Sequence, residues 1–271
     1  MPPNSLGRSP DCGRVVAYAD CGRGSGTLWQ ARLYTNEAPR PEGRGFKMME
    51  PGRIGGLPTP IDRGRVEAAT PLRIGVLVSG RGSNLRALLE AFPVGHPLVH
   101  IGLVVTNRSG CGAIEYAREA AIPVEIVSGS DYASRDAQQA AMAARLAAAE
   151  SDLVVLAGYD QVLGPSLLEP YAGRMINIHP SLLPAFGGTL HAQAAALRHG
   201  VKVTGCTVHF VTPEIDGGPI IAQEVVPIRD EDTVESLSLR ILAQEHVILP
   251  RVVALIAAGK VRVEGRRVRV D

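Results

Sequence analysis

The chain has 271 residues, of which 45% are hydrophobic and 20% are charged, and its formal net charge is +1. This composition supplies enough apolar side chains for one large domain or two small ones. The near-neutral charge excludes the basic surface typical of nucleic-acid-binding proteins, and no apolar run approaches the roughly 20 residues that a membrane-spanning helix needs. Small-molecule chemistry is therefore the default expectation.

The first 70 residues are rich in Gly, Pro and Arg and show neither helical nor strand periodicity. We interpret residues 1–70 as a disordered or low-order extension and residues 71–271 as the functional domain. A transit peptide would fit this segment, but its scattered acidic residues argue against one. Met48 or Met49 is an alternative translation start.

The cysteines form no C-x-x-C pair and no Cys/His cluster at metal-ligand spacing. Cys12 and Cys21 belong to the extension, while Cys111 and Cys206 are far apart in the sequence. We therefore predict no metal site, and thiols that stay reduced in a cytoplasmic protein.

From Leu72 onward, short β-branched runs alternate with Ala-rich segments of helical length. Such alternation is typical of strands and helices around a parallel sheet, and near-continuous apolar runs indicate strands that are buried on both faces. The predicted strands are Leu72–Ser79, His100–Thr106, Pro123–Val127, Leu153–Leu156 and Met175–Ile178. The predicted helices between them are Asn84–Phe92, Gly112–Ala121 and Ser134–Ala148.

After His179 the pattern changes to two strands, Lys202–Val211 and Ile220–Pro227, joined by a turn. A long helix, Thr233–Ala258, and a closing hairpin, Val261–Val270, follow them. The predicted fold class is α/β: a doubly wound, Rossmann-like, mostly parallel sheet with antiparallel strands added in the C-terminal half.

The first candidate site is the loop Ser79–Asn84, which joins the first strand to the first helix. Its glycines let the backbone turn tightly, and the free N–H groups and dipole of a helix N-terminus favour an anion such as phosphate. An equally weighted alternative is a tight turn in which Ser83 or Asn84 caps the helix. The loop lacks the third glycine of the dinucleotide fingerprint and the Gly-Lys-Ser/Thr of a nucleotide triphosphate loop.

The second candidate site is Asn177 and His179, at the end of a strand that we predict to be central. Residues two apart on a strand point to the same side, so both side chains can face one cleft at the carboxyl end of the sheet. A histidine there is more often structural than catalytic when it is considered alone.

The third candidate site is the loop Thr212–Pro219, which carries Glu214 and Asp216. A carboxylate beside an imidazole raises the pKa of the imidazole and fixes its tautomer, as a general acid near neutral pH requires. Asp216 is the better candidate because glycines follow it. The alternative, that Asp216 only forms an Asp-Gly turn, has similar weight.

These motifs, in this order, resemble those of the phosphoribosylglycinamide formyltransferase family, folate-dependent enzymes of purine synthesis. The segment Asn177–Pro184 is similar to the signature of the folate formyltransferase superfamily. Gly205–Val211, leading to Asp216–Pro219, resembles its second signature, and the likeness runs from about Leu72 to Lys260. The Gly80–Asn84 loop resembles the substrate phosphate site of the glycinamide ribonucleotide enzymes.

The resemblance implies formyl transfer from 10-formyltetrahydrofolate to the amine of 5-phosphoribosylglycinamide, with Asn177, His179 and Asp216 as catalytic residues. It implies that the ribonucleotide is held by Gly82, Ser83, Asn84, Leu242, Ala243, Gln244 and Glu245. It implies that formylfolate is held by Arg135, Asp160, Gln161, Val162, Leu163 and Asn177, and by Thr212, Pro213, Glu214, Ile215 and Asp216.

The same resemblance implies small-molecule substrates, no nucleic-acid or membrane partner, a cytoplasmic location, and a monomer or homodimer. Two features depart from the family pattern. Gln161 stands where some relatives carry Arg, which bears on the polyglutamate tail, and the segment Phe186–His191 is unusual in composition.

Three alternative functions remain at this stage. One is another folate-dependent formyltransferase. A formyltetrahydrofolate hydrolase would keep the fold and use water as the acceptor, but it would have no phosphate for the loop at residues 80–84 to bind. A non-catalytic nucleotide-binding module would bind ligand without formyl transfer.

Overall fold

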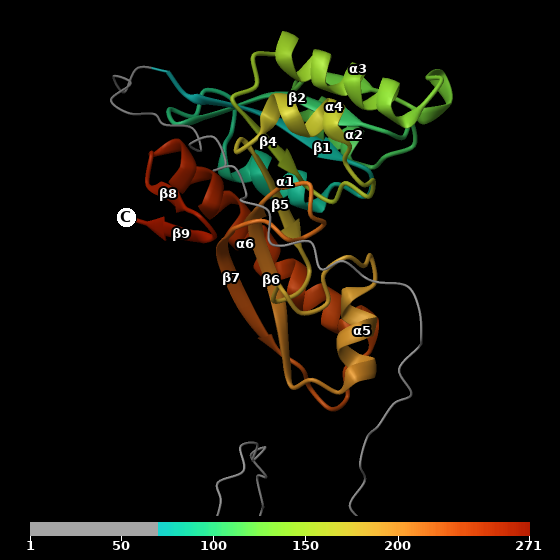
Figure 1. Cartoon of the computed structure of the whole chain (residues 1–271), viewed down its shortest axis with the longest axis vertical. Coiled ribbons are helices and arrows are strands. Elements are labelled where there is room, and N and C mark those ends of the chain that lie inside the picture. Colours follow the sequence, from blue (N-terminus) through green and yellow to red (C-terminus); the bar gives the residue numbers. More distant parts are fainter. Residues whose placement is uncertain (1–69) are drawn as a thin grey trace, which may run out of the picture. The chain divides into compact units, whose positions relative to one another are not determined.

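The computed structural model of the protein describes residues 70–271 (Figure 1). The interpretation of the N-terminal extension, the alternative start at Met48 or Met49, and Cys12 and Cys21 lie outside the described residues. Within them, the predicted α/β class is confirmed: a seven-stranded sheet has the order β3-β2-β1-β4-β5-β6-β7, and β8 and β9 form a separate two-stranded sheet.

The large sheet is parallel from β3 to β5 and antiparallel from β5 to β7. Its strand ends agree with the predicted ranges to within one residue. The strands are β1 (Leu72–Val78), β2 (Val99–Thr106), β3 (Val124–Ile126), β4 (Leu153–Leu156), β5 (Met175–His179), β6 (Val203–Phe210) and β7 (Ile220–Pro227). The closing hairpin pairs β8 (Val261–Glu264) with β9 (Arg267–Val270), as predicted.

The predicted helices are present; α1 is shifted by one residue toward the N-terminus, and the other three are slightly shorter than predicted. They are α1 (Ser83–Ala91), α2 (Ala113–Glu119), α3 (Arg135–Ala148) and α6 (Val234–Ala257). Capping residues set two of these starts: the Ser134 hydroxyl accepts from Ala137 N, and Thr233 forms a capping box with Ser236.

Helices cover both faces of the sheet, and the alternation of side chains along β1 shows why. Ile74, Val76 and Val78 pack in one apolar cluster with α1, α2 and α6. Leu77 points the other way and packs with α3 and the short helix α4 (Pro165–Leu168). All four side chains are fully buried, which accounts for the near-continuous apolar sequence of this strand.

Several short elements were not predicted: α4, α5 (Ala192–His199) and the 3-10 turns Gly129–Asp131 and Glu169–Tyr171. They are too short to show a clear apolar period, and α5 buries mainly alanines, which give a weak pattern. Of the helices in residues 70–271, none is long and apolar enough to cross a membrane.

Candidate active site

The loop between β1 and α1 leaves the first turn of the helix uncapped by any side chain. The N-cap residue is Gly82, in the left-handed conformation with φ +81, and it makes no side-chain cap. A Cβ at this position would lie 2.5 Å from Cα of Ala113 on α2, so only glycine fits. The alternative in which Ser83 or Asn84 caps the helix is therefore wrong, and the N–H groups of the first turn remain suited to an anion.

Asn84 joins α1 to α6 through a buried hydrogen bond. Its Nδ2 donates to Oε2 of Glu245 at 2.8 Å, and the two residues are only 6% and 7% exposed. Burial raises the pKa of Glu245, and the hydrogen bond from Asn84 opposes that rise. Oδ1 of Asn84 has no hydrogen-bond partner among the described residues. The loop between β1 and α1 thus lies beside a carboxyl group whose ionisation is disfavoured by burial.

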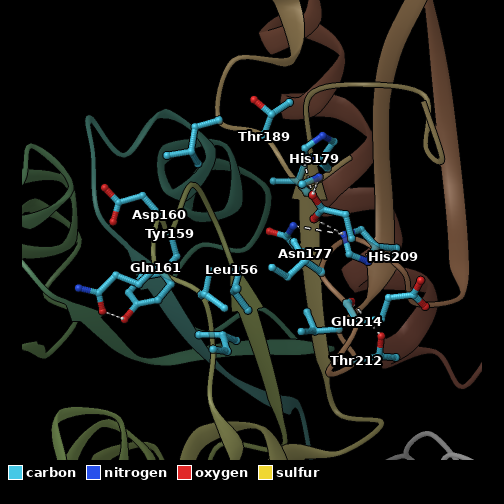
Figure 2. Close-up of a pocket in the computed structure, with 18 of the residues that line it drawn as sticks. Leu156, Tyr159, Asp160, Gln161, Asn177, His179, Thr189, His209, Thr212 and Glu214 are labelled. Atoms are coloured by element: carbon cyan, nitrogen blue, oxygen red, sulfur yellow. Dashed lines mark hydrogen bonds and ion pairs between the residues drawn. The ribbon is translucent and has the colours of Figure 1, made fainter. Parts of the chain in front are cut away.

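The carboxyl end of β5 presents Asn177 and His179 to the same cavity, as their spacing on the strand predicts (Figure 2). His179 is 5% exposed. Its Nδ1 lies 3.3 Å from Oδ2 of Asp216, and its Nε2 lies 2.9 Å from the carbonyl oxygen of Phe186. Burial lowers the pKa of His179, while the Asp216 carboxylate and the Phe186 carbonyl partly offset this.

Asp216 is held from two directions in the loop after β6. Oδ2 accepts a hydrogen bond from Gly188 N at 2.8 Å in addition to its contact with His179. Burial alone would raise the pKa of Asp216, but the contacts with His209, Gly188 and His179 outweigh burial and hold that pKa below its ordinary value. The carboxylate is therefore negative near neutral pH and faces an imidazole.

His209 belongs to the same cluster; it lies in the second signature stretch, Gly205–Val211, but no role was predicted for it. Its Nδ1 lies 2.9 Å from the Phe210 carbonyl oxygen, so a neutral ring keeps its proton there and offers Nε2 as an acceptor, whereas a protonated ring directs Nε2–H at Asp216. Nε2 lies 3.2 Å from Nδ2 of Asn177 and 3.6 Å from Oδ1 of Asp216. The missing signal was strand register: residue 209 on β6 lies directly opposite residue 177 on β5.

A cavity of about 420 Å³ opens beside these side chains. Its wall includes the segment 160–163 after β4 and the segment 212–216 after β6, both of which the resemblance assigned to formylfolate. Arg135, assigned to the same ligand, does not line the cavity; it begins α3 and acts electrostatically on the lining residue Tyr159. Gly82, Ser83, Asn84 and Glu245 also lie outside the lining.

The helix α6 carries the remaining predicted ribonucleotide residues. Leu242 and Gln244 are half-buried beside the buried Glu245, whereas Ala243 is exposed. Ala243 thus points away from the position that Glu245 shares with Asn84.

Comparisons with known proteins show the family to which the chain belongs. The sequence pattern of the formyl transferase family matches residues 72–253. Phosphoribosylglycinamide formyltransferase of Mycobacterium tuberculosis is 47% identical over 202 residues, which are 74% of this chain and 93% of that protein. The chain belongs to the phosphoribosylglycinamide formyltransferase family.

Solved structures and larger relatives support the membership. Glycinamide ribonucleotide transformylase 1 from Symbiobacterium toebii superimposes with a TM-score of 0.70 at 47% identity, covering 74% of this chain and 94% of that one. The trifunctional purine biosynthetic protein adenosine-3 of Bos taurus is 42% identical over 190 residues. This chain spans only 19% of the length of the bovine protein.

In this family member, Asp160 links the loops that follow β1, β2 and β4 at the cavity wall. Its carboxylate contacts Arg108 and accepts from Nδ2 of Asn107 at 3.2 Å, while its backbone N donates to the Ser79 hydroxyl at 3.1 Å. The charge of Asp160 is therefore paired with a guanidinium from the loop after β2. The next side chain, Gln161, accepts from the Tyr159 hydroxyl at 3.0 Å (Figure 2).

The formyltransferase site can supply hydrogen bonds and a proton, and nothing in it resembles a metal centre. Within the part of the chain that the structure describes, no three His, Cys, Asp or Glu side chains are grouped to hold a metal ion. Cys111 and Cys206 are buried free thiols away from the cavity lining. The usable groups are an amide, an imidazole and a carboxylate at the end of one cavity.

Proposed function

We propose that this chain transfers a formyl group from 10-formyltetrahydrofolate to the amine of 5-phosphoribosylglycinamide in de novo purine biosynthesis. The observation that carries the proposal is the contact of His179 with Asp216, 3.3 Å apart, beside Asn177 at the end of the cavity. Family membership supports the same reaction, because related enzymes of similar length are named phosphoribosylglycinamide formyltransferase.

10-Formyltetrahydrofolate supplies the formyl carbon and the nitrogen that leaves. Asn177 donates from its amide, and His179 donates from its imidazolium, to the negative charge that develops on the formyl oxygen as the substrate amine adds. One hydrogen of the Asn177 Nδ2 group points to His209, which leaves the other free for this oxygen.

Asp216 orients His179 and stabilises its charged form. The amine must lose a proton as it becomes an amide, and the departing folate nitrogen must gain one, so the net proton count is unchanged. The imidazole and the carboxylate, with water, pass this proton between the two nitrogens.

The remaining residues hold the two substrates at either side of this cluster. Gly82, Ser83 and Asn84 bind the phosphate through the helix N-terminus, and Glu245 accepts from ribose hydroxyls. The segments 160–163 and 212–216 enclose the folate ring system, and Arg135 offers a positive charge outside the cavity. We further place the reaction in the cytoplasm, in a monomer or a homodimer, which size-exclusion chromatography distinguishes.

The decisive experiment measures loss of the formyl group from 10-formyltetrahydrofolate with and without the ribonucleotide. Turnover that requires the ribonucleotide supports the proposal, whereas equal turnover without it identifies a hydrolase. His179→Ala should lower kcat on the order of 10²–10³-fold and leave the ribonucleotide Kd unchanged. A variant with wild-type turnover would exclude His179 from catalysis.

A further inference from the structure

Both ring nitrogens of His179 already face hydrogen-bond acceptors. Nδ1 faces Oδ2 of Asp216 at 3.3 Å, and Nε2 faces the carbonyl oxygen of Phe186 at 2.9 Å. When His179 carries its positive charge, each nitrogen has one proton. The Nε2 proton is donated to the Phe186 carbonyl, and the Nδ1 proton lies on the side of the Asp216 carboxylate, with which the ring forms an ion pair. The imidazolium in this arrangement has no N–H left for a substrate.

The developing charge on the formyl oxygen therefore has to replace one of the two acceptors. Asp216 is the partner that neutralises the buried imidazolium, and its Oδ2 is also held by Gly188 N at 2.8 Å. Removing that carboxylate would leave a charged ring unpaired in a site where His179 is 5% exposed. The neutral carbonyl is the acceptor that can leave at lower cost.

We propose that the main-chain carbonyl of Phe186 is a placeholder for the formyl oxygen, and that binding of the formyl donor displaces it. This inference rests on the proposed function, since it takes His179 as the group that donates to the formyl oxygen. It adds Phe186 as a positioning residue: before the donor arrives, its carbonyl holds the ring of His179 with Nε2 directed at one oxygen.

The backbone conformation of Phe186 is consistent with a carbonyl that can be displaced from His179. Phe186 has φ +57, in the left-handed region that L-residues avoid, whereas Gly188, two residues on, adopts φ +72 without that cost. The Phe186 ring packs edge-on against His199, with ring centroids 5.5 Å apart. The resting arrangement is thus unfavourable at one backbone position and is anchored by the ring and the carbonyl.

A pair of substitutions separates the backbone from the ring. Both Phe186→Ala and Phe186→Gly lose the ring contact, but only glycine removes the cost of the left-handed turn. Glycine should therefore favour the resting arrangement, and 10-formyltetrahydrofolate should bind the Gly variant more weakly than the Ala variant. The expected difference in Kd is on the order of 5- to 30-fold, which corresponds to about 1–2 kcal/mol.

The ribonucleotide Kd should be the same in both variants, which also checks that each is folded. Equal donor affinity in the Gly and Ala variants, or tighter binding by the Gly variant, would overturn the proposal. A second measurement needs no variant: in a crystal structure of the wild-type protein with the formyl donor, Nε2 of His179 should have left the Phe186 carbonyl. Retention of that hydrogen bond with the donor in place would also overturn it. Neither result depends on whether His179→Ala is inactive, so the two proposals fail separately.

Discussion

Replacing Asn84 by alanine should destabilise the protein in a way that depends on pH. The side chain is 6% exposed and donates at 2.8 Å to Glu245, which is 7% exposed. A hydrogen bond to a charged group contributes about 1.5–3 kcal/mol, and a neutral one about 0.5–1.5 kcal/mol. We therefore expect Asn84→Ala to lower the free energy of unfolding by about 2 kcal/mol at pH 8, where Glu245 is most ionised, without any ligand.

The sign of the pH effect follows from the direction of the pKa shift. Burial raises the pKa of Glu245 above its ordinary value of 4.5, so ionising this carboxyl destabilises the fold as the pH rises above 4.5. Asn84 limits that rise, and its removal raises the pKa of Glu245 further. The difference between wild type and Asn84→Ala should consequently be larger at pH 8 than at pH 5, where a larger fraction of the carboxyl is protonated and loses only a neutral hydrogen bond.

Urea denaturation at the two pH values, followed by circular dichroism, measures these differences. The matched control is Glu245→Gln, in which a neutral amide oxygen can still accept from Asn84. In that background Asn84→Ala should cost only about 1 kcal/mol, at either pH. A cost of Asn84→Ala in the wild-type background that is the same at pH 5 and pH 8 would refute the reasoning.

Two other substitutions test the cluster around the cavity, and a pair of glycine substitutions tests backbone packing. Asp216→Asn removes the carboxylate that raises the pKa of His179 and leaves the burial that lowers it, so this pKa should fall. Because catalysis uses the imidazolium, the alkaline limb of the kcat/KM profile should move to lower pH. An unmoved or upward-shifted limb would count against the assignment. His209→Phe leaves Asn177 without its acceptor and should lower kcat about fivefold with ribonucleotide affinity retained; an unchanged kcat in a turnover assay would show that His209 does not position the amide. Gly218→Ala would place a Cβ 1.8 Å from the Phe210 carbonyl oxygen and should lower the free energy of unfolding, measured by urea denaturation, by about 1–3 kcal/mol. The control Gly110→Ala, whose Cβ would have no atom within 4 Å, should leave the stability nearly unchanged. Equal stability of the two variants would contradict the packing argument.

The sequence was most informative where a pattern is local. The buried strands β1 and β4 could be predicted because they are covered on both faces and are therefore almost continuously apolar. The long helix α6 was predicted to within one residue at each end, and the structure shows that a capping box at Thr233 fixes its start. The short helix α5 was missed because alanines fill its buried face and give little contrast with its exposed side.

Contacts between distant segments were harder to predict. Asn84 and Glu245 are 161 positions apart, and their hydrogen bond depends on how α1 packs against α6. His209 lies within the second signature stretch, Gly205–Val211, but its place in the cluster depends on strand register, which sets it opposite Asn177. The carbonyl of Phe186 is a backbone group, which no residue-type pattern can assign to a site. The roles of Asn177, His179 and Asp216 were inferred from motif and resemblance, and they stay predictions until turnover is measured.

The reversal of direction at β6 has a consequence for inhibitor design and for enzyme engineering. Because β6 runs against β5, its end at Phe210 lies beside Ile176, and the chain must travel back along the cavity to bring Asp216 to His179. The returning stretch, residues 211–216, forms one part of the cavity wall. A bulkier folate analogue that pushes this wall outward would also draw the carboxylate off the imidazole. Enlarging the binding site for new donors should therefore slow the chemistry unless the Gly188 anchor of Asp216 is preserved.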